Sequence, residues 1–257
     1  MRSVLYFCLL HGKESFFFGL FFAYTLMNNR ITMKNNIVLI LVLILFSYAS
    51  KAQDKAKPFD LSIRIGPNVN WFKSNSAAVK GDGLALGFTW GALFEFPLKD
   101  NFSYVGGFNI HFVGGELNYT GLNQSIPVIV NEKYTIKYLE LPVIFKLRTK
   151  EENGILYYGQ VGLGTSFRLN SRVARSFSSS TATFEPQELN SDNLTSFIRE
   201  SLIVGIGAQY SLQNNLKLFG GLNFNSGFTD ILKKGPYNTS DPKVISNFVE
   251  FNFGLYF

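Results

Sequence analysis

The chain has 257 residues, a length that suits one large domain or two small ones. Charged residues make up only 16% of it, whereas soluble domains average roughly a quarter, and Phe (27) and Tyr (12) are abundant. Without residues 1–52 the chain keeps 19 basic and 17 acidic residues, a net charge of +2 instead of +6. This balance gives no reason to expect nucleic acid as a partner.

Residues 33–52 have the features of a secretory signal peptide. A basic start at Met33 precedes an apolar run at 37–48, and Ser50 and Ala52 supply the small residues of a cleavage site. Residues 1–32 contain a second apolar stretch upstream of this complete signal. They arise either from a start codon assigned too early, with Met33 the true initiator, or from an extended leader or a transmembrane helix.

Cleavage of this leader would remove Cys8, the one cysteine of the chain. The exported protein would then have no disulfide, no thiolate nucleophile and no Cys-based zinc site. A cleaved signal peptide also predicts export through the inner membrane. Residues 53–58 follow it as a short polar stub.

From residue 59 onward, apolar and polar residues alternate with a period of two, which predicts strands rather than helices. The pattern is clearest at 247–257, where Phe251 and Phe253 share an apolar face and Glu250 and Asn252 lie on the opposite one. We expect eight strands, at 59–72, 84–98, 102–119, 133–149, 155–174, 196–212, 216–232 and 247–257.

The connections between these strands alternate in length. The connections at 99–100, 150–154 and 213–215 are short and polar, whereas those at 73–83, 120–132, 175–195 and 233–245 are longer. Short turns at one end and long loops at the other are typical of outer-membrane barrels, whose long loops lie outside the cell.

Period two alone does not tell a membrane barrel from a soluble one, because a soluble barrel turns its apolar rows inward. Here the apolar rows are continuous and rich in aromatic residues, and the opposite rows carry Gly, Asn, Gln, Ser and charges. These features favour apolar rows that face lipid. We therefore predict an all-β fold, an eight-stranded antiparallel up-and-down transmembrane β-barrel over residues 59–257, in the bacterial outer membrane.

One stretch carries a family resemblance. Tyr138-Leu-Glu-Leu-Pro-Val-Ile-Phe-Lys146 resembles the most recognisable motif of the PorT-like outer-membrane β-barrel family, and Ser62-Ile-Arg-Ile-Gly-Pro-Asn68 is similar to that family's first strand. The resemblance covers residues 59–257 and implies a Gram-negative outer-membrane protein. The founding member is associated with a protein secretion system, but no residue here is diagnostic of secretion.

Charged residues recur on the faces expected to line the lumen. Glu140 lies on such a face with Pro142, and a buried carboxylate without a partner is costly. The alternation places basic residues of neighbouring strands on the same interior. We therefore expect a structural charge cluster that fills a narrow lumen and stabilises the barrel. Its members are Arg64, Glu95, Glu140, Lys146, Arg148 and Arg168.

Candidate catalytic groups are few. His11 lies in the leader, and His111 is expected to face the lumen. A serine hydrolase would pair His111 with Ser166, Ser201 or Ser226 and a carboxylate, but no motif singles out one serine. One remaining His without Cys predicts no metal site, and no cofactor is expected. Acidic loop residues such as Asp192 and Asp230 are expected to be solvated.

The sequence thus predicts a non-enzymatic barrel with a structural or protein-interaction role. The alternatives are a small pore and a lipid-modifying enzyme that uses His111. The terminal row Phe253, Leu255 and Phe257 resembles the C-terminal aromatic signal by which such barrels are delivered to the barrel assembly machinery. The expected partners are outer-membrane lipid, that machinery during insertion, and envelope or secretion proteins.

Overall fold

The computed structural model describes residues 59–123, 126–179, 184–212, 216–233 and 242–257. The predicted leader and the polar stub lie outside the described residues. Among those that are described, no helix is long and apolar enough to cross a membrane. The strands are β1 (Asp60–Ser74), β2 (Val79–Asp82), β3 (Ala85–Lys99), β4 (Phe102–Asn123), β5 (Ile126–Arg148), β6 (Ile155–Ser178), β7 (Gln187–Asn190), β8 (Ile198–Ser211), β9 (Lys217–Gly227) and β10 (Val244–Tyr256).

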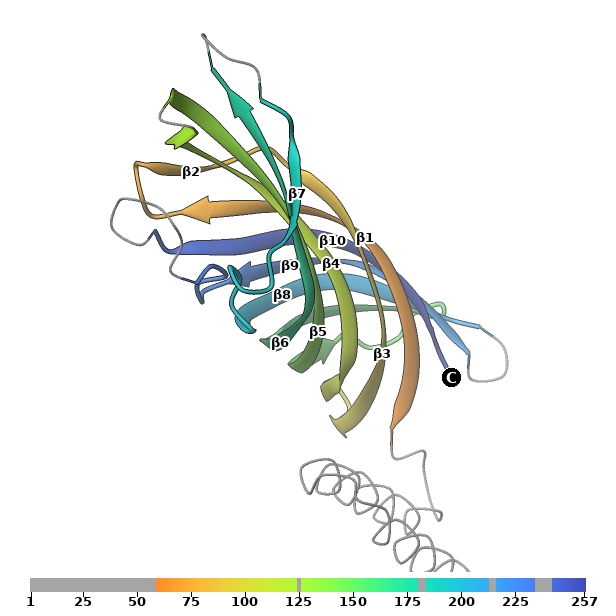
Figure 1. Cartoon of the computed structure of the whole chain (residues 1–257). Coiled ribbons are helices and arrows are strands. Elements are labelled where there is room, and N and C mark those ends of the chain that lie inside the picture. The colour runs from red at the N-terminus through yellow and green to blue at the C-terminus, as the bar shows by residue number, and fades with distance from the viewer. Residues whose placement is uncertain (1–58, 124–125, 180–183, 213–215, 234–241) are drawn as a thin grey trace, which may run out of the picture. The chain divides into compact units, whose positions relative to one another are not determined.

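Eight of these strands close into an antiparallel ring (Figure 1). Starting from β1, the ring runs through β3, β4, β5, β6, β8, β9 and β10, each paired with its neighbour in the chain's up-and-down order. The last strand returns to the first, with Ile63 opposite Leu255 and Ile65 opposite Phe253. The predicted eight-stranded barrel is confirmed.

The alternation has the predicted polarity. On β1, Ser62 and Arg64 are buried in the interior while Ile63 and Ile65 are exposed, and β10 repeats the pattern. Neighbouring strands add further exposed Phe, Leu, Val and Ile side chains to an outer belt. An apolar exterior around a polar interior is the arrangement of a barrel whose solvent is lipid.

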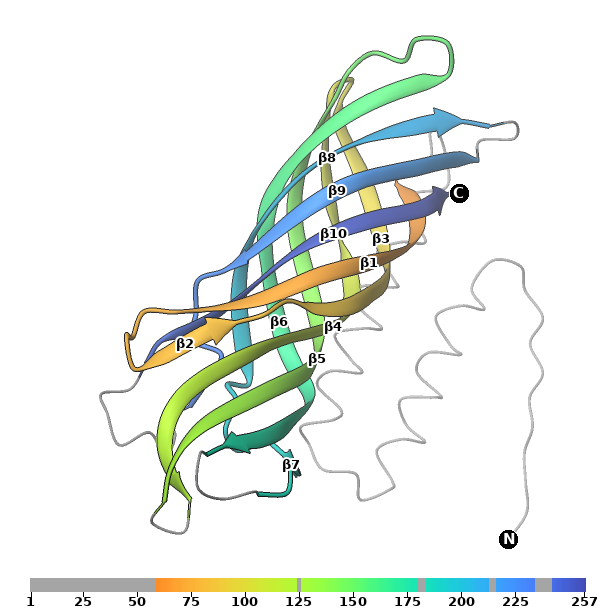
Figure 2. The same cartoon turned by 90° about the horizontal axis from the view of Figure 1, so that it is seen from above.

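The wall extends beyond the eight-stranded ring at the end opposite the C-terminus, where β2 and β7 lie (Figure 2). There β2 pairs with the later part of β4, and β7 pairs with the later part of β6. The prediction of a long link at 120–132 is wrong, because β4 and β5 continue through it. Val128 and Val130 maintain the alternation and are buried, so this stretch stays a strand.

Other predicted boundaries also change. The links at 73–83 and 175–195 contain the short strands β2 and β7. β9 ends at Gly227 rather than at residue 232, and Ile231 and Leu232 beyond it turn into the interior. Both side chains join an apolar cluster of lumen-facing residues at the end of the barrel that carries β2 and β7, here called the loop end. The sequence did not predict this cluster. Its members are Phe72, Val79, Val113, Leu117, Tyr134, Ile136, Tyr138, Val173, Ile231, Leu232, Val244 and Phe248.

A bulge in β6 changes which residues of that strand face the lumen. Lys137 pairs with Asn170 and Tyr138 with Arg168, so Leu169 has no partner on β5. The alternation shifts by one residue beyond this point. Asn170 therefore lies with Lys137 on the outer face, and Val173 points inward and is buried.

Pro142 lies at a local interruption of the β4–β5 ladder. The register includes Gly106–Val143 and Asn109–Glu140 but no pair between them, at the position where Gly107 faces Pro142. Proline has no N–H to donate, so a gap in the ladder is expected there. Gly107 has a φ of 146°, and a Cβ added to it would lie 2.3 Å from the Ala92 carbonyl oxygen.

We predict that Gly107→Ala lowers the free energy of unfolding by about 1–3 kcal/mol, because an L-residue is strained in that conformation. The matched control is Gly159→Ala, since an added Cβ there meets nothing within 4 Å. Urea unfolding of the barrel in lipid vesicles, followed by Trp fluorescence, measures both. Equal stability of the two variants would contradict this role for Gly107.

Candidate functional site: a filled lumen and a pocket at the loop end

The short-turn end of the lumen is held by a group centred on Glu95. Its carboxylate accepts hydrogen bonds from Ser103 Oγ at 2.6 Å and Lys146 Nζ at 2.8 Å. Lys146 also donates to Tyr256 Oη at 3.0 Å, and Arg148 Nη1 lies 3.4 Å from Glu95 Oε1. Glu95 and Lys146 are both buried, so each charge needs the other to offset its lost hydration.

A second pair joins the strands that close the ring. Arg64 on β1 forms an ion pair with Glu250 on β10, and both side chains are buried. Gly66 lies beside this pair, and a Cβ there would approach Glu250 Oε1 to 2.9 Å. The glycine therefore leaves room for the carboxylate at the seam between the first and last strands.

The third group surrounds Glu140. Asn109 Nδ2 and Asn225 Nδ2 donate to its two oxygens at 3.0 and 3.1 Å, and His111 Nε2 lies 3.1 Å from Oε1. Asn225 in turn accepts a hydrogen bond from Arg199 Nη2 at 2.6 Å. Four strands thus meet around one buried carboxylate.

Arg168 lies apart from these groups, toward the loop end. Its Nη1 is 2.5 Å from Asp192 Oδ1, an oxygen that also accepts from the backbone N–H of Ser171. Asp230 likewise accepts from two backbone N–H groups, those of Leu232 and Val244. The prediction that Asp192 and Asp230 are merely solvated is therefore wrong. The six predicted charged residues fall into separate groups along the lumen instead of one cluster.

His111 does not contact any of the three serines proposed as nucleophiles. Ser201 Oγ donates to the Gly164 carbonyl and Ser226 Oγ to Asn247, while Ser166 is buried. The hydroxyl beside His111 Nδ1 belongs to Thr89, at 2.8 Å. Thr89, His111 and Glu140 form a buried chain of hydrogen bonds, whose residues all face the barrel interior.

Arg199 and Glu250 carry much of this network but were not among the predicted cluster. A signal for both existed in the sequence. Arg199 lies two residues before Ser201 on a lumen-facing row, and Glu250 shares its row with Asn252. Their partners could not be predicted, because strand register is needed to bring Arg199 to Asn225 and Arg64 to Glu250.

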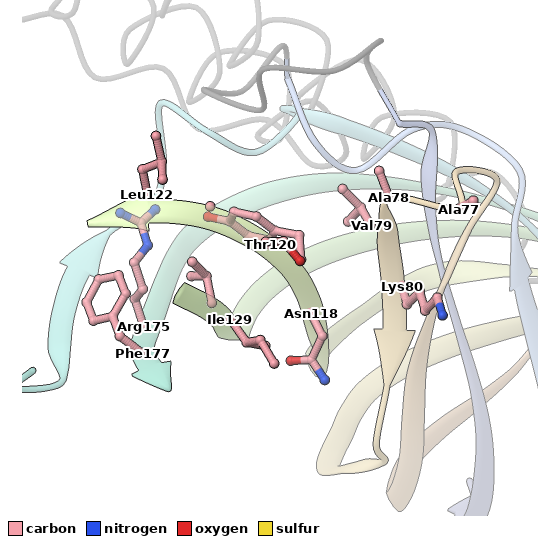
Figure 3. Close-up of a pocket in the computed structure, with 13 residues that line it drawn as sticks. Ala77, Ala78, Val79, Lys80, Asn118, Thr120, Leu122, Ile129, Arg175 and Phe177 are labelled. Atoms are coloured by element: carbon pink, nitrogen blue, oxygen red, sulfur yellow. The ribbon is translucent and has the colours of Figure 1, made fainter. Parts of the chain in front are cut away.

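A pocket of about 700 Å³ lies at the loop end, between β2 and the extended parts of β4, β5 and β6 (Figure 3). Lys80 of β2, and Arg175 and Phe177 of β6, are among its lining residues. Arg175 Nε donates to Glu132 Oε1 at 2.8 Å, and Tyr119 Oη donates to the same oxygen. Burial lowers the pKa of Arg175, but the Glu132 carboxylate outweighs this effect and raises it.

Within the described part of the chain, no group of three or more His, Cys, Asp or Glu residues is arranged to hold a metal ion. The pocket combines two cations with aromatic and aliphatic walls. In the lumen, in contrast, the charged side chains of Glu95, Lys146, Arg64, Glu250 and Glu140 are already paired with one another or with neighbouring polar groups.

A family model described as "Outer membrane protein beta-barrel domain" matches residues 51–233. Among solved structures, Ail of Yersinia pestis in complex with the heparin analogue sucrose octasulfate is 16% identical, with 78% of this chain and 100% of that chain covered and a TM-score of 0.35. Neisserial surface protein A is 12% identical over 76% and 95% of the two chains, with a TM-score of 0.41. The outer membrane protease OmpT of Escherichia coli is 11% identical over 79% and 99%, with a TM-score of 0.29. A search of curated proteins finds no match.

We predict that Glu140→Gln lowers the free energy of unfolding by about 1–3 kcal/mol, because the new amide would set a donor against the donors of Asn109 or Asn225. The matched control is Glu116→Gln, which removes a surface pair with Lys133 at 3.4 Å and should cost about 1 kcal/mol or less. Urea titrations in lipid vesicles measure both. A larger loss from the surface variant would contradict a stabilising role for the lumen carboxylate.

Proposed function

The chain belongs to the outer membrane protein beta-barrel domain family, and from that premise we propose that it serves a structural or protein-interaction role in the bacterial outer membrane. Export through a signal peptide at residues 33–52 is part of this proposal. So is delivery to the barrel assembly machinery by the terminal row Phe253, Leu255 and Phe257. Of that row, Phe253 and Phe257 are exposed, and the Phe257 N–H donates to the Leu61 carbonyl.

The observation that carries the proposal is the filled lumen. Charged groups centred on Glu95, Arg64 and Glu140 occupy it from the short-turn end upward, and the apolar cluster around Phe72 and Tyr134 fills it at the loop end. Eight strands enclose an interior just wide enough for side chains. This packing favours a scaffold over a conduit.

The same packing argues against an enzyme that uses His111. The imidazole lies between Thr89 and Glu140, and the three residues are at most 2% exposed. A hydrolase needs its nucleophile within reach of a substrate and beside an oxyanion site. Here the hydroxyl of Thr89 already accepts a hydrogen bond from Asn68. A structural role of this chain of hydrogen bonds accounts for all of its contacts.

The loop end offers the surface for an interaction. The β4–β5 hairpin carries exposed apolar side chains, Leu122 and Ile129, beside the pocket described above. Outer-membrane barrels place their long loops outside the cell, so this surface would meet partners there. We propose envelope or secretion proteins as the partner class, on the resemblance of residues 138–146 to the PorT-like family, and such proteins can also be reached from the short-turn end.

We predict that a photo-crosslinking residue introduced at Leu122 captures a protein partner in intact cells, because this side chain is exposed near the end of the β4–β5 hairpin. The matched position at the opposite end is Asp100, in the β3–β4 turn. Mass spectrometry of the crosslinked bands identifies the partner. Capture at Asp100 alone would place the interaction in the periplasm, and capture at neither position would contradict an interaction role.

A pore would conduct ions across a membrane, whereas a filled lumen would not. We expect the purified barrel to give no steady single-channel steps in a planar bilayer, because its lumen-facing side chains are packed against one another. A useful comparison is the double variant Phe72→Ala/Phe248→Ala, which thins the apolar cluster at the loop end. Steady steps from the unmodified protein would overturn the ranking of scaffold above pore.

A further inference from the structure

The outer wall of the barrel has a gap in its strand pairing near the loop end. On β4, pairing with β3 ends at Phe112 and pairing with β2 begins at Glu116. Between them, Gly114 is paired only on its other side, with Thr135 of β5. A hollow of about 350 Å³ opens at this gap, and Gly114, which has no side chain, lines it.

One side of this outer-wall groove is apolar. Leu84, Leu86 and Phe112 line it, and Leu86 is 88% exposed. The row continues downward along β3 through Phe88 and Trp90, which belong to the outer belt. An acyl chain lying on the belt can therefore extend into the groove without leaving apolar surface.

On its other side the groove is lined by Lys133 and Thr135, and two more cations lie next to these residues. Lys133 and Lys137 flank Thr135 on the outer face of β5, and Arg172 is the direct partner of Thr135 on β6. Directly paired residues project from the same face of a sheet, so Lys133, Lys137 and Arg172 share the outer face with Thr135. Lys133 is 3.4 Å from Glu116, whereas neither Lys137 nor Arg172 forms an ion pair within the described residues.

The height of these cations matches a membrane boundary. On the outer face of β5, the residues from Leu139 to Leu147 are apolar at every second position, and Lys137 is the first charged residue above them. The Lys137 ammonium also lies over the Phe112 ring, 5.3 Å from its centroid. Basic residues at the edge of an apolar belt attract anionic lipid headgroups.

We propose that this groove binds a phosphorylated, multiply acylated glycolipid of the outer leaflet. An acyl chain would lie on Leu84, Leu86 and Phe112, and the phosphates would bind Lys133, Lys137 and Arg172. Four residue steps along the strand separate the two lysines by roughly 13 Å, a span that suits more than one phosphate. The proposal requires the barrel to span the outer membrane with its long loops outside, but it does not depend on any protein partner.

The test uses the full chain in a neutral detergent, titrated with bisphosphorylated lipid A and followed by native mass spectrometry. We expect Lys133→Gln/Lys137→Gln/Arg172→Gln to weaken binding roughly 100-fold, since each basic residue near an anionic headgroup contributes about a factor of five. The matched control, Lys73→Gln/Lys99→Gln/Lys150→Gln, removes the same charge from exposed positions elsewhere and should leave the affinity unchanged.

A second variant tests the apolar wall. Leu86→Asn changes a side chain that is already exposed, so it should fold normally and weaken lipid A binding roughly tenfold. Its binding of the bisphosphorylated headgroup sugar without acyl chains should not change. Equal losses in the two triple variants would overturn the site. Equal affinity for lipid A, dephosphorylated lipid A or phosphatidylglycerol would overturn the proposed ligand, whatever the crosslinking experiment finds.

Discussion

The structure depends on one constraint, which is that every strand separates two different environments. The outer face must be apolar because lipid offers no hydrogen-bond partners, and the inner face carries buried charges, each of which is costly without a partner. The closing pair β1–β10 shows both halves of the constraint. Ile63 and Phe253 face outward, while Arg64 and Glu250 neutralise each other inside. Closing the ring therefore also brings these two charges together.

This constraint explains why the lumen charges are distributed in separate groups. A single cluster would bring like charges together in a narrow tube, whereas pairs at different heights leave each carboxylate beside its own cation or donors. Glu95 has Lys146, Glu250 has Arg64, and Glu140 has His111 with two asparagines. Above them the ring continues as a sheet around an apolar cluster, and the charges found there are again paired, Arg168 with Asp192 and Arg175 with Glu132.

The fold was predictable because alternation divides each strand into two faces independently of strand pairing, and the composition of the two rows indicated which face meets lipid. For the same reason, Arg64, Glu95, Glu140 and Lys146 were placed correctly on inner faces. What alternation lacks is register. It could not show that Leu169 is bulged, that residues 126–132 continue β5, or which partner each charge meets. Those facts depend on contacts between residues far apart in the chain.

The extended hairpin of β4 and β5 has a further consequence. Between Lys137 at the edge of the apolar belt and Ile126 lie eleven residue steps, or about 35 Å of strand. A stiff sheet of that length acts as a pedestal. It carries the tip at Leu122 away from the bilayer plane, beyond the headgroup zone, where diffusing macromolecules can approach it without first displacing lipid. The barrel thereby holds Leu122 at a fixed distance from the membrane, which a flexible loop of equal length would not do.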